Sequence, residues 1–403
     1  MQSGWRIGSI LGIPLFIDSS WFIILLLVTV SYGLDPTWQQ TWGTLAWGMG
    51  LGLALLLFGS VLMHELGHSV AAKFQGIDVN SITLFLFGGI ASIDRESSTP
   101  EDAFKVAIAG PLVSFSLFLI LTGVSQIGVL PDPIQVITGS VAQINLVLTL
   151  FNLIPGLPLD GGQVLKAIVW KVTKSRIQGI RWASRSGQIL GWIAITFGLV
   201  MAFAYQIFSG FWIAAIGWFA LRNAAAYGQM SNLQEAMLSL KAGDAMARDF
   251  RVVDADMTLR QFADNYLLED NRAPVYFAAS EGRYRGLVNI DDLRTLERSQ
   301  WETLTLNSIV KPLLTIPSLR EQDPLTKAID CLEALQVPRL TVLSPADAVA
   351  GIIDRGEIVR AIADRLGLRI SPAIIQRIKE DGQYPPGLQL ASIARAAGEE
   401  AKA

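Results

Sequence analysis

The segment VLMHELGHSV, residues 61–70, places two histidines and a glutamate near the end of a long apolar run that begins at about Thr44. On a helix, His64 and His68 are one turn apart and project from the same face, so both imidazoles can bind one metal ion. Glu65 can then reach a water molecule bound to that ion. The pattern is H-E-x-x-H, which is typical of zinc-dependent hydrolysis.

Two observations favour a metal site over a chance match with two packed polar residues. His64 and His68 are the only histidines among 403 residues. Ionisable residues at membrane depth are costly and usually mark a functional site. Catalytic zinc takes three protein ligands, and the only cysteine, Cys331, lies far away in a more polar part of the chain. The third ligand is therefore expected to be a carboxylate or another oxygen.

Asp160, in FNLIPGLPLDGG at residues 151–162, is the candidate for this third ligand. Asp160 lies six residues before Lys166, and His68 lies five residues before Lys73. If both lysines mark the same membrane border, a helical rise of about 1.5 Å per residue puts both side chains roughly 8 to 10 Å inside it. The prolines and glycines of the segment disfavour a continuous helix. Non-helical backbone at membrane depth is tolerated only where it is buried in protein or lines a water-filled cavity. Hydrolysis needs such a cavity.

The composition divides the chain into a membrane part and a soluble part. Apolar residues make up 51% of the chain and charged residues only 17%, which is too apolar for one soluble globule. From Gln229 onward the charge density becomes that of an ordinary soluble protein. We therefore expect a membrane domain over residues 1–228. The net charge of −3, without a basic block, argues against nucleic-acid binding, and a single cysteine can form no internal disulfide.

Six stretches are apolar enough to suggest membrane spans of about 20 residues. They are residues 16–34, 44–73, 104–127, 134–156, 187–207 and 210–227. With six spans, all clusters of Lys and Arg fall on one side of the membrane, which the positive-inside rule makes the cytoplasm. Both termini and the soluble part are then cytoplasmic, whereas five spans would break the pattern. No secretory signal is recognisable, which suits a bacterial inner membrane.

Together these motifs resemble the site-2 protease family (peptidase family M50) of intramembrane zinc metalloproteases. HELGH matches the family's H-E-x-x-H, and NLIPGLPLDGG matches its N-x-x-P-x-x-x-x-D-G element. The resemblance implies that His64, His68 and Asp160 bind one zinc ion. It also implies that Glu65 is the general base and that Asn152 polarises or holds the scissile peptide.

The resemblance further implies a zinc metalloendopeptidase that cuts a transmembrane helix of another protein near the cytoplasmic side of the lipid membrane. A membrane-tethered transcriptional regulator is one such substrate. The β-prone segment LFLFGGIAS, residues 84–92, predicts a re-entrant strand or loop, which in the family pairs with the unwound substrate. An ordinary amphipathic turn is the alternative. Gly110 in AGPLVSF is expected to allow close approach of helices.

The soluble part contains two similar units, residues 241–300 and 305–368, followed by a tail over 369–403. Each unit predicts a short helix, a strand (residues 250–253 and 314–316), an amphipathic helix, two further strands and a last helix. The repeat resembles a tandem pair of CBS domains, which implies an intramolecular pair, binding of an adenine nucleotide and a homodimer. The tail predicts one helix (SPAIIQRIKE), a Pro-Pro turn and an Ala/Glu-rich end.

The ligand element that this resemblance implies reads GLVNIDD in the first unit, with Asn289 at the hydroxyl position and Asp292 at the acidic one. The second unit reads GIIDRGE, where Asp354 would point a negative charge towards a phosphate. A nucleotide is therefore expected only at the first unit. A docking module without a ligand is the alternative.

The sequence as a whole predicts a polytopic α-helical membrane protein of about six transmembrane helices with a re-entrant β segment, followed by a cytoplasmic α/β CBS pair. An intramembrane zinc protease is the leading hypothesis. A metal-dependent transporter or channel and a catalytically silent relative are the alternatives. Glu65 discriminates among them, because only peptide hydrolysis needs a base next to the ligands.

Overall fold

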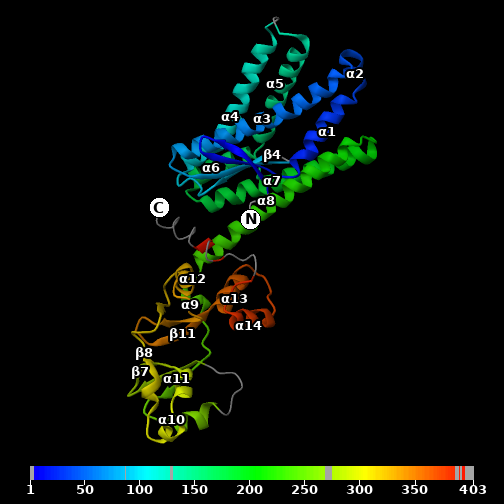
Figure 1. Ribbon diagram of the computed structural model, residues 1–403. Coiled ribbons are helices and arrows are strands. Elements are labelled where there is room, and N and C mark those ends of the chain that lie inside the picture. The colour runs from blue at the N-terminus through cyan, green and yellow to red at the C-terminus, as the bar shows by residue number, and fades with distance from the viewer. Residues whose placement is uncertain are drawn as a thin grey trace. The chain divides into compact units, whose positions relative to one another are not determined.

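The computed structural model describes residues 4–86, 88–127, 130–267, 275–385, 390 and 393–394. The chain divides into two compact units, Met1–Ser231 and Asn232–Ala403 (Figure 1). The first unit holds the long apolar helices. The second holds two small sheets with short helices.

Each predicted apolar stretch corresponds to a helix with shifted ends, and two further helices lie between these stretches. These helices are α1 (Trp21–Gly33), α2 (Pro36–Trp42), α3 (Leu45–Phe74), α4 (Pro100–Ser125), α5 (Asp132–Asn152), α6 (Asp160–Thr173), α7 (Arg176–Ala204) and α8 (Ser209–Ser239). Local signals set several of these ends. Thr99 caps α4 by accepting from the Asp102 N–H at 3.2 Å, and Ser175 caps α7 in the same way.

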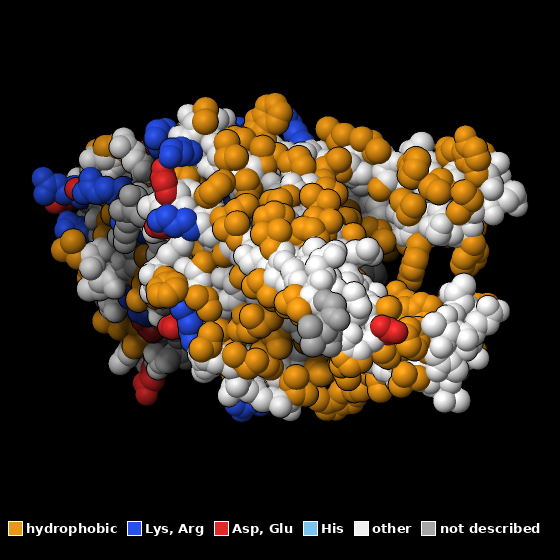
Figure 2. Space-filling view, turned by 90° about the horizontal axis from the view of Figure 1, so that it is seen from above, with side chains coloured by type: hydrophobic (Ala, Val, Ile, Leu, Met, Phe, Trp, Pro, Cys, Tyr) orange, Lys and Arg blue, Asp and Glu red, His pale blue; other side chains and the backbone are white. Residues whose placement is uncertain are grey.

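The span count of six is not confirmed. By length and composition, α3, α4, α5 and α7 can cross a membrane, and the bent pair of α1 and α2 makes a fifth candidate. The predicted sixth stretch, residues 210–227, is helical as the first part of α8, but α8 is not among these candidates. The apolar helices expose large hydrophobic side chains, for example Ile120 and Ile193, and Figure 2 shows a broad hydrophobic area on the face that it draws. Such a surface suits a lipid environment.

A four-stranded sheet lies within the first unit, and half of it was not expected from the sequence. The strands are β1 (Trp5–Ile10), β2 (Ile13–Ile17), β3 (Val79–Phe85) and β4 (Gly88–Ile93), in the order β1-β2-β3-β4. Gly12, at φ +78°, provides the turn between β1 and β2. The predicted span that started at residue 16 is wrong at its start, because β2 ends at Ile17 and α1 begins only at Trp21.

The predicted β segment at residues 84–92 forms part of a hairpin. In it, β3 and β4 pair antiparallel from Val79 opposite Ile93 to Phe85 opposite Gly88, whereas residue 87 lies outside the described residues. β4 is the last strand in the sheet order and packs against α3. The strand character of the segment is therefore observed, while its depth in a membrane stays a prediction.

The second unit contains two sheets and the helices that cover them. Its helical elements are α9 (Ala242–Ala245), α10 (Leu259–Phe262), α11 (Ile290–Thr295), α12 (Leu325–Ala334), α13 (Arg355–Arg365) and α14 (Pro372–Asp381). One sheet has the order β5 (Phe250–Asp254), β6 (Val275–Ser280), β7 (Arg283–Val288) and β8 (Val310–Pro312). The other has the order β11 (Val349–Asp354), β10 (Arg339–Leu343) and β9 (Ser318–Arg320).

The two repeats of this unit exchange their first segments. β8 opens the second repeat but pairs with β7 of the first. Conversely, Ala247 precedes β5 in the first repeat and exchanges two backbone hydrogen bonds of 2.8 and 2.9 Å with Ile352 in β11. Phe277 and Ile352 also belong to one buried apolar cluster. The repeats therefore share backbone pairing and part of their core.

Two details of the second unit differ from expectation or go beyond it. The strand predicted at residues 314–316 is wrong, because this stretch is a turn between β8 and β9, in which Leu314 is fully exposed. The helix predicted in the tail is α14, and its Ile375 and Ile378 are buried in the core of the second repeat. The Ala/Glu-rich end after residue 394 lies outside the described residues.

Candidate functional site

Helix α3 presents both histidines to the interior of the first unit. His64 is 3% exposed and His68 is 8% exposed. Their helix packs closely on α4, since a β-carbon at Gly67 would come within 2.9 Å of the Ala109 carbonyl oxygen. The glycine between the histidines therefore lets α4 approach the face that carries them.

Asp160 reaches the histidines from a break in the helical chain. α5 ends at Asn152 and α6 begins at Asp160, so the predicted interruption of the helix is confirmed. The intervening loop is anchored on α7, where the Leu157 N–H donates to the Ala183 carbonyl at 3.1 Å. A β-carbon at Gly161 would lie 2.3 Å from the Leu153 carbonyl oxygen, so the start of α6 can pack on the loop only with glycine there. This packing fixes the position of the first residue of α6.

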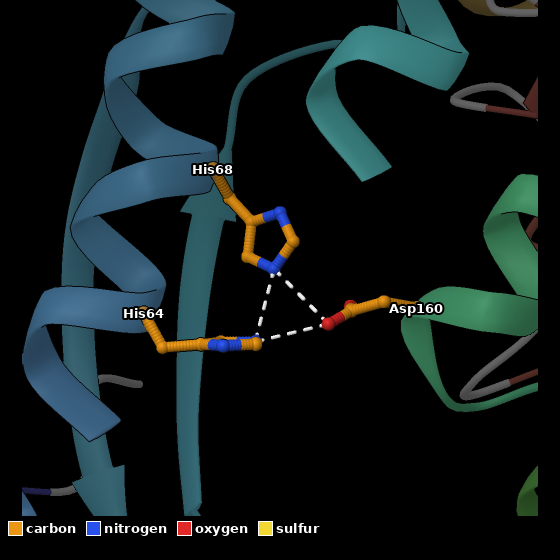
Figure 3. Close-up of side chains that lie close together, drawn as sticks. All are labelled: His64, His68 and Asp160. Atoms are coloured by element: carbon orange, nitrogen blue, oxygen red, sulfur yellow. Dashed lines mark hydrogen bonds and ion pairs between the residues drawn. The ribbon is translucent and has the colours of Figure 1, made fainter. Parts of the chain in front are cut away.

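The three side chains converge, as Figure 3 shows. The Asp160 Oδ2 atom is 2.9 Å from His64 Nε2 and 3.3 Å from His68 Nε2. The two Nε2 atoms are 3.3 Å apart. These residues form a group that could hold a metal ion, with two imidazoles and one carboxylate as donors. This donor set is one that zinc prefers in catalytic sites.

Helix α4 contacts both imidazoles on their Nδ1 side, away from Asp160. His64 Nδ1 lies 2.9 Å from the Ser114 hydroxyl oxygen, and His68 Nδ1 lies 2.7 Å from the Val106 carbonyl oxygen. The carbonyl can only accept, so His68 carries its proton on Nδ1 and leaves Nε2 free to bind a metal. Partners of this kind fix the tautomer and the ring orientation of metal-binding histidines.

Gly110 leaves the space in front of the Nε2 atoms open. A β-carbon at residue 110 would lie 2.2 Å from His68 Nε2 and 2.8 Å from His64 Nε2. The predicted close approach of helices at Gly110 is therefore an approach to the histidines themselves. Together with the donor set, this open cradle fits a bound metal ion.

Glu65 and Asn152 lie at the edge of the same site. The Asn152 side-chain nitrogen is 3.4 Å from His64 Nε2. Glu65 faces β4, where a β-carbon at Gly89 would come within 2.5 Å of the Glu65 Cγ atom. The structure thus brings together all five residues that the two motifs predict, His64, Glu65, His68, Asn152 and Asp160. Sequence reasoning missed Ser114 and Val106, because only the packing of α4 on α3 brings them to the histidines.

The candidate ligand residues of the first repeat lie where β7 leads into α11. Asn289 occupies the N-cap position of α11 and makes no capping hydrogen bond with its side chain, and Asp292 lies in the first turn. Among the described residues, neither side chain makes a hydrogen bond or an ion pair. Both polar side chains are therefore available to a ligand.

The equivalent position of the second repeat is covered by the tail. Lys379 of α14 places its ammonium 2.5 Å from a Glu357 carboxylate oxygen and 3.7 Å from an Asp354 one. A β-carbon at Gly356 would lie 2.6 Å from the Lys379 Cγ atom. Both acidic groups thus have a cation from the same chain, so the two repeats are not equivalent.

Comparisons with known proteins match both units. The model of "Peptidase family M50" matches residues 52–132 and 132–193, and that of "CBS domain" matches residues 242–298. "Putative zinc metalloprotease sll0528" of Synechocystis sp. is 41% identical over 364 residues, which are 90% of this chain and 96% of the relative. "Putative zinc metalloprotease Rip3" of Mycobacterium tuberculosis is 30% identical over 369 residues, 90% of this chain and 93% of the relative.

A solved structure, "Site-2 Protease from Methanocaldococcus jannaschii", shares 30% identity, with a TM-score of 0.41, and covers 56% of this chain and 95% of its own. The likeness to the Synechocystis relative extends over nearly the full length of both chains. This chain therefore belongs to peptidase family M50, the site-2 protease family, and carries a CBS domain in its second unit.

Proposed function

We propose that this protein is an intramembrane zinc metalloendopeptidase in which His64, His68 and Asp160 hold the metal. The observation that carries the proposal is the convergence of both Nε2 atoms on the Asp160 carboxylate, while α4 occupies both Nδ1 atoms. Zinc bound by these residues would supply a Lewis acid that polarises a peptide carbonyl and lowers the pKa of water.

Glu65 is the proposed general base. Glu65 directly follows His64 on α3, and its side chain faces the strand β4. It therefore lies between the candidate metal ligands and the proposed substrate-binding strand. Glu65 takes a proton from the attacking water molecule and passes it to the leaving amine. The peptide bond is thereby replaced by a carboxylate and a free amine.

Asn152 and β4 are the proposed substrate contacts. The Asn152 amide lies beside His64 and can donate to the carbonyl oxygen of the scissile peptide. β4, as the last strand of its sheet, can pair with an extended peptide. Such pairing satisfies the backbone groups of an unwound substrate, which lipid cannot do.

The proposed substrate is therefore a transmembrane segment of another protein, for instance of a membrane-tethered transcriptional regulator. The four helices that are long and apolar enough to cross a membrane support a site within a membrane unit. The distribution of Lys and Arg supports a site near the cytoplasmic face of a cell membrane, with both termini and the CBS unit cytoplasmic. A transporter would need no acid at position 65, so the presence of Glu65 favours the peptidase.

The test compares wild type with Glu65→Gln in liposomes, and measures cleavage of a transmembrane peptide together with bound zinc. We expect the variant to bind one zinc ion and to lose cleavage by at least about 10²-fold, because the base is gone. Glu101→Gln, a change at an exposed carboxylate, is the matched control and should cleave like wild type. A wild-type protein without zinc, or a fully active Glu65→Gln, would refute the proposal.

For the second unit we propose a regulatory role, with an adenine nucleotide at Asn289 and Asp292 and homodimers formed through this unit. The free side chains at the start of α11 support the first site, whereas Lys379 already neutralises the second. AMP is the probe. We expect calorimetry to show binding to wild type, loss in Asp292→Ala and retention in Asp291→Ala, whose carboxylate is more than four-fifths exposed. Equal binding to both variants would contradict this site.

AMP should also change the cleavage rate of wild type but not that of Asp292→Ala. An unchanged cleavage rate with AMP bound would refute the regulatory role but leave the proposed binding site standing.

A further inference from the structure

Three charged side chains meet where the loop after β4 passes α6 and the start of α7. The Glu96 Oε2 atom lies 2.6 Å from the Lys166 ammonium and 2.7 Å from the Arg176 guanidinium. The Lys166 side chain is only 7% exposed, although lysine rarely tolerates burial. We call these three residues the Glu96 clamp.

The electrostatics of the clamp agree with its geometry. Partial burial raises the pKa of Glu96, but the neighbouring cations Lys166 and Arg176 outweigh this effect and hold the pKa at about 2. Glu96 is therefore ionised throughout the physiological range, and Lys166 has a permanent partner.

The clamp joins elements that carry different parts of the metal site. His64 and His68 lie on α3, which packs against α4 and β4. Asp160 lies on α6, which packs against α4 and α7. Glu96 connects the loop between β4 and α4 to both α6 and α7, so it adds a direct link between the two sides.

The position of Lys166 on α6 gives the link its effect on Asp160. Asp160 is the first residue of α6, and Lys166 lies about 9 Å further along the helix axis, on a different face. A second fixed point of this kind restrains rotation of α6 about its axis. A metal ligand must be held within about 0.5 Å of its productive position, so even a small rotation matters.

Lys166 cannot simply lose its partner and stay in place. A buried ammonium without a counter-charge pays a large desolvation cost. If Glu96 loses its charge, we expect the Lys166 ammonium to move towards solvent, which removes the contact that ties this part of α6 to the loop after β4.

We propose that Lys166 is a positioning residue, and that the Glu96 clamp orients α6 so that Asp160 meets His64 and His68. This inference rests on the proposed function, since it concerns the same metal site. Neither H-E-x-x-H nor the LDGG segment contains any member of the clamp.

The chain offers a matched control on nearly the same elements. Lys171 on α6 pairs with Glu101 at the start of α4 at 3.1 Å, but these side chains are 61% and 51% exposed. Exposed pairs contribute little to structure. Lys171→Met thus removes a charge from the same helix without removing a buried ion pair.

The experiment uses the purified full-length chain and measures zinc affinity by competition with a chelator, and kcat and KM with a transmembrane peptide. We expect Lys166→Met and Glu96→Gln to weaken zinc binding by about 10- to 100-fold, as for other residues that orient metal ligands. kcat should fall while KM stays close to wild type, because the substrate contacts are intact. Lys171→Met should match wild type, and Lys166→Arg should recover most of the zinc affinity.

Each outcome has a distinct meaning. If Glu96→Gln and Lys166→Met bind zinc as tightly as wild type, the clamp is refuted while the proposed function stands. Wild type that binds no zinc refutes both. If Lys166→Met does not fold, the half-exposed Glu96→Gln decides, and a wild-type zinc affinity in that variant overturns the inference.

Discussion

Gly110 of α4 lies so close to His68 that a β-carbon at residue 110 would sit 2.2 Å from the His68 Nε2 atom. The same atom would be 2.8 Å from His64 Nε2. The space in front of both Nε2 atoms is therefore kept open by a residue without a side chain, on a helix that supplies none of the three candidate metal ligands.

Gly110→Ala should weaken metal binding, because the added methyl group fills the space in front of both Nε2 atoms. We expect zinc affinity to fall by more than about 10-fold, and cleavage to fall with it. The measurement is zinc content after dialysis against a chelator. Gly123→Ala on the same helix is the control, since a β-carbon there meets nothing within 4 Å. Full zinc content in Gly110→Ala would contradict the claim that Gly110 keeps the space for the metal ion open.

Gly89→Ala should separate catalysis from metal binding. A β-carbon at Gly89 would come within 2.5 Å of Glu65 Cγ, so alanine must displace the Glu65 side chain or β4. We expect kcat to fall by about 10²-fold, as for a misplaced general base, with the zinc content unchanged. Gly8→Ala in β1, where the added atom meets nothing within 4 Å, should keep wild-type kcat. An unaffected kcat in Gly89→Ala would argue against Glu65 as the base.

Ser114→Ala should weaken zinc binding while leaving the ligands themselves intact. Its hydroxyl lies 2.9 Å from His64 Nδ1, so its removal frees the imidazole to rotate and leaves Nδ1 without its partner. We expect about 10-fold weaker zinc binding in a chelator competition. Ser116→Ala serves as the control, because that hydroxyl donates to the Leu112 carbonyl on an exposed face of the same helix. Equal affinities of the two variants would mean that Ser114 does not orient His64.

Lys379→Met should destabilise the second unit, because it removes a cation from Glu357, which is only 1% exposed. Arg360 still pairs with Glu357, so the loss should be about 1 to 3 kcal/mol rather than the full cost of an unpaired buried charge. Thermal unfolding of the chain measures it. Lys327→Met, which breaks an exposed pair with Asp323, should shift the midpoint little. Equal shifts would show that α14 contributes no special stability.

The sequence was sufficient where the geometry is local. The spacing of His64 and His68 places them on one face of any helix, and the prolines and glycines after Asn152 end α5 whatever surrounds them. The sequence also pointed to Asp160, because the chain has no third histidine and its single cysteine lies in the second unit. These features follow from backbone geometry and from composition.

Predictions from the sequence were wrong where pairing with strands far along the chain decides the local structure. Residues 314–316 have strand-like side chains but form a turn, because β8 and β9 on either side pair with β7 and β10 instead. The apolar pattern predicts a membrane span from residue 16, but residues up to Ile17 belong to a sheet, because β2 pairs with β1 on one side and with β3 on the other. Short apolar runs do not specify which strand they will join.

The sequence by itself determined which residues could bind zinc and activate water, because that chemistry depends on residue types and on one helical turn. Only the tertiary structure decided what orients them. Ser114 lies 50 positions from His64, and Glu96 lies 70 positions from Lys166, so nothing local links them. The packing of α4 on α3 and the burial of one lysine bring these partners together, since buried polar groups must find partners wherever the fold supplies them.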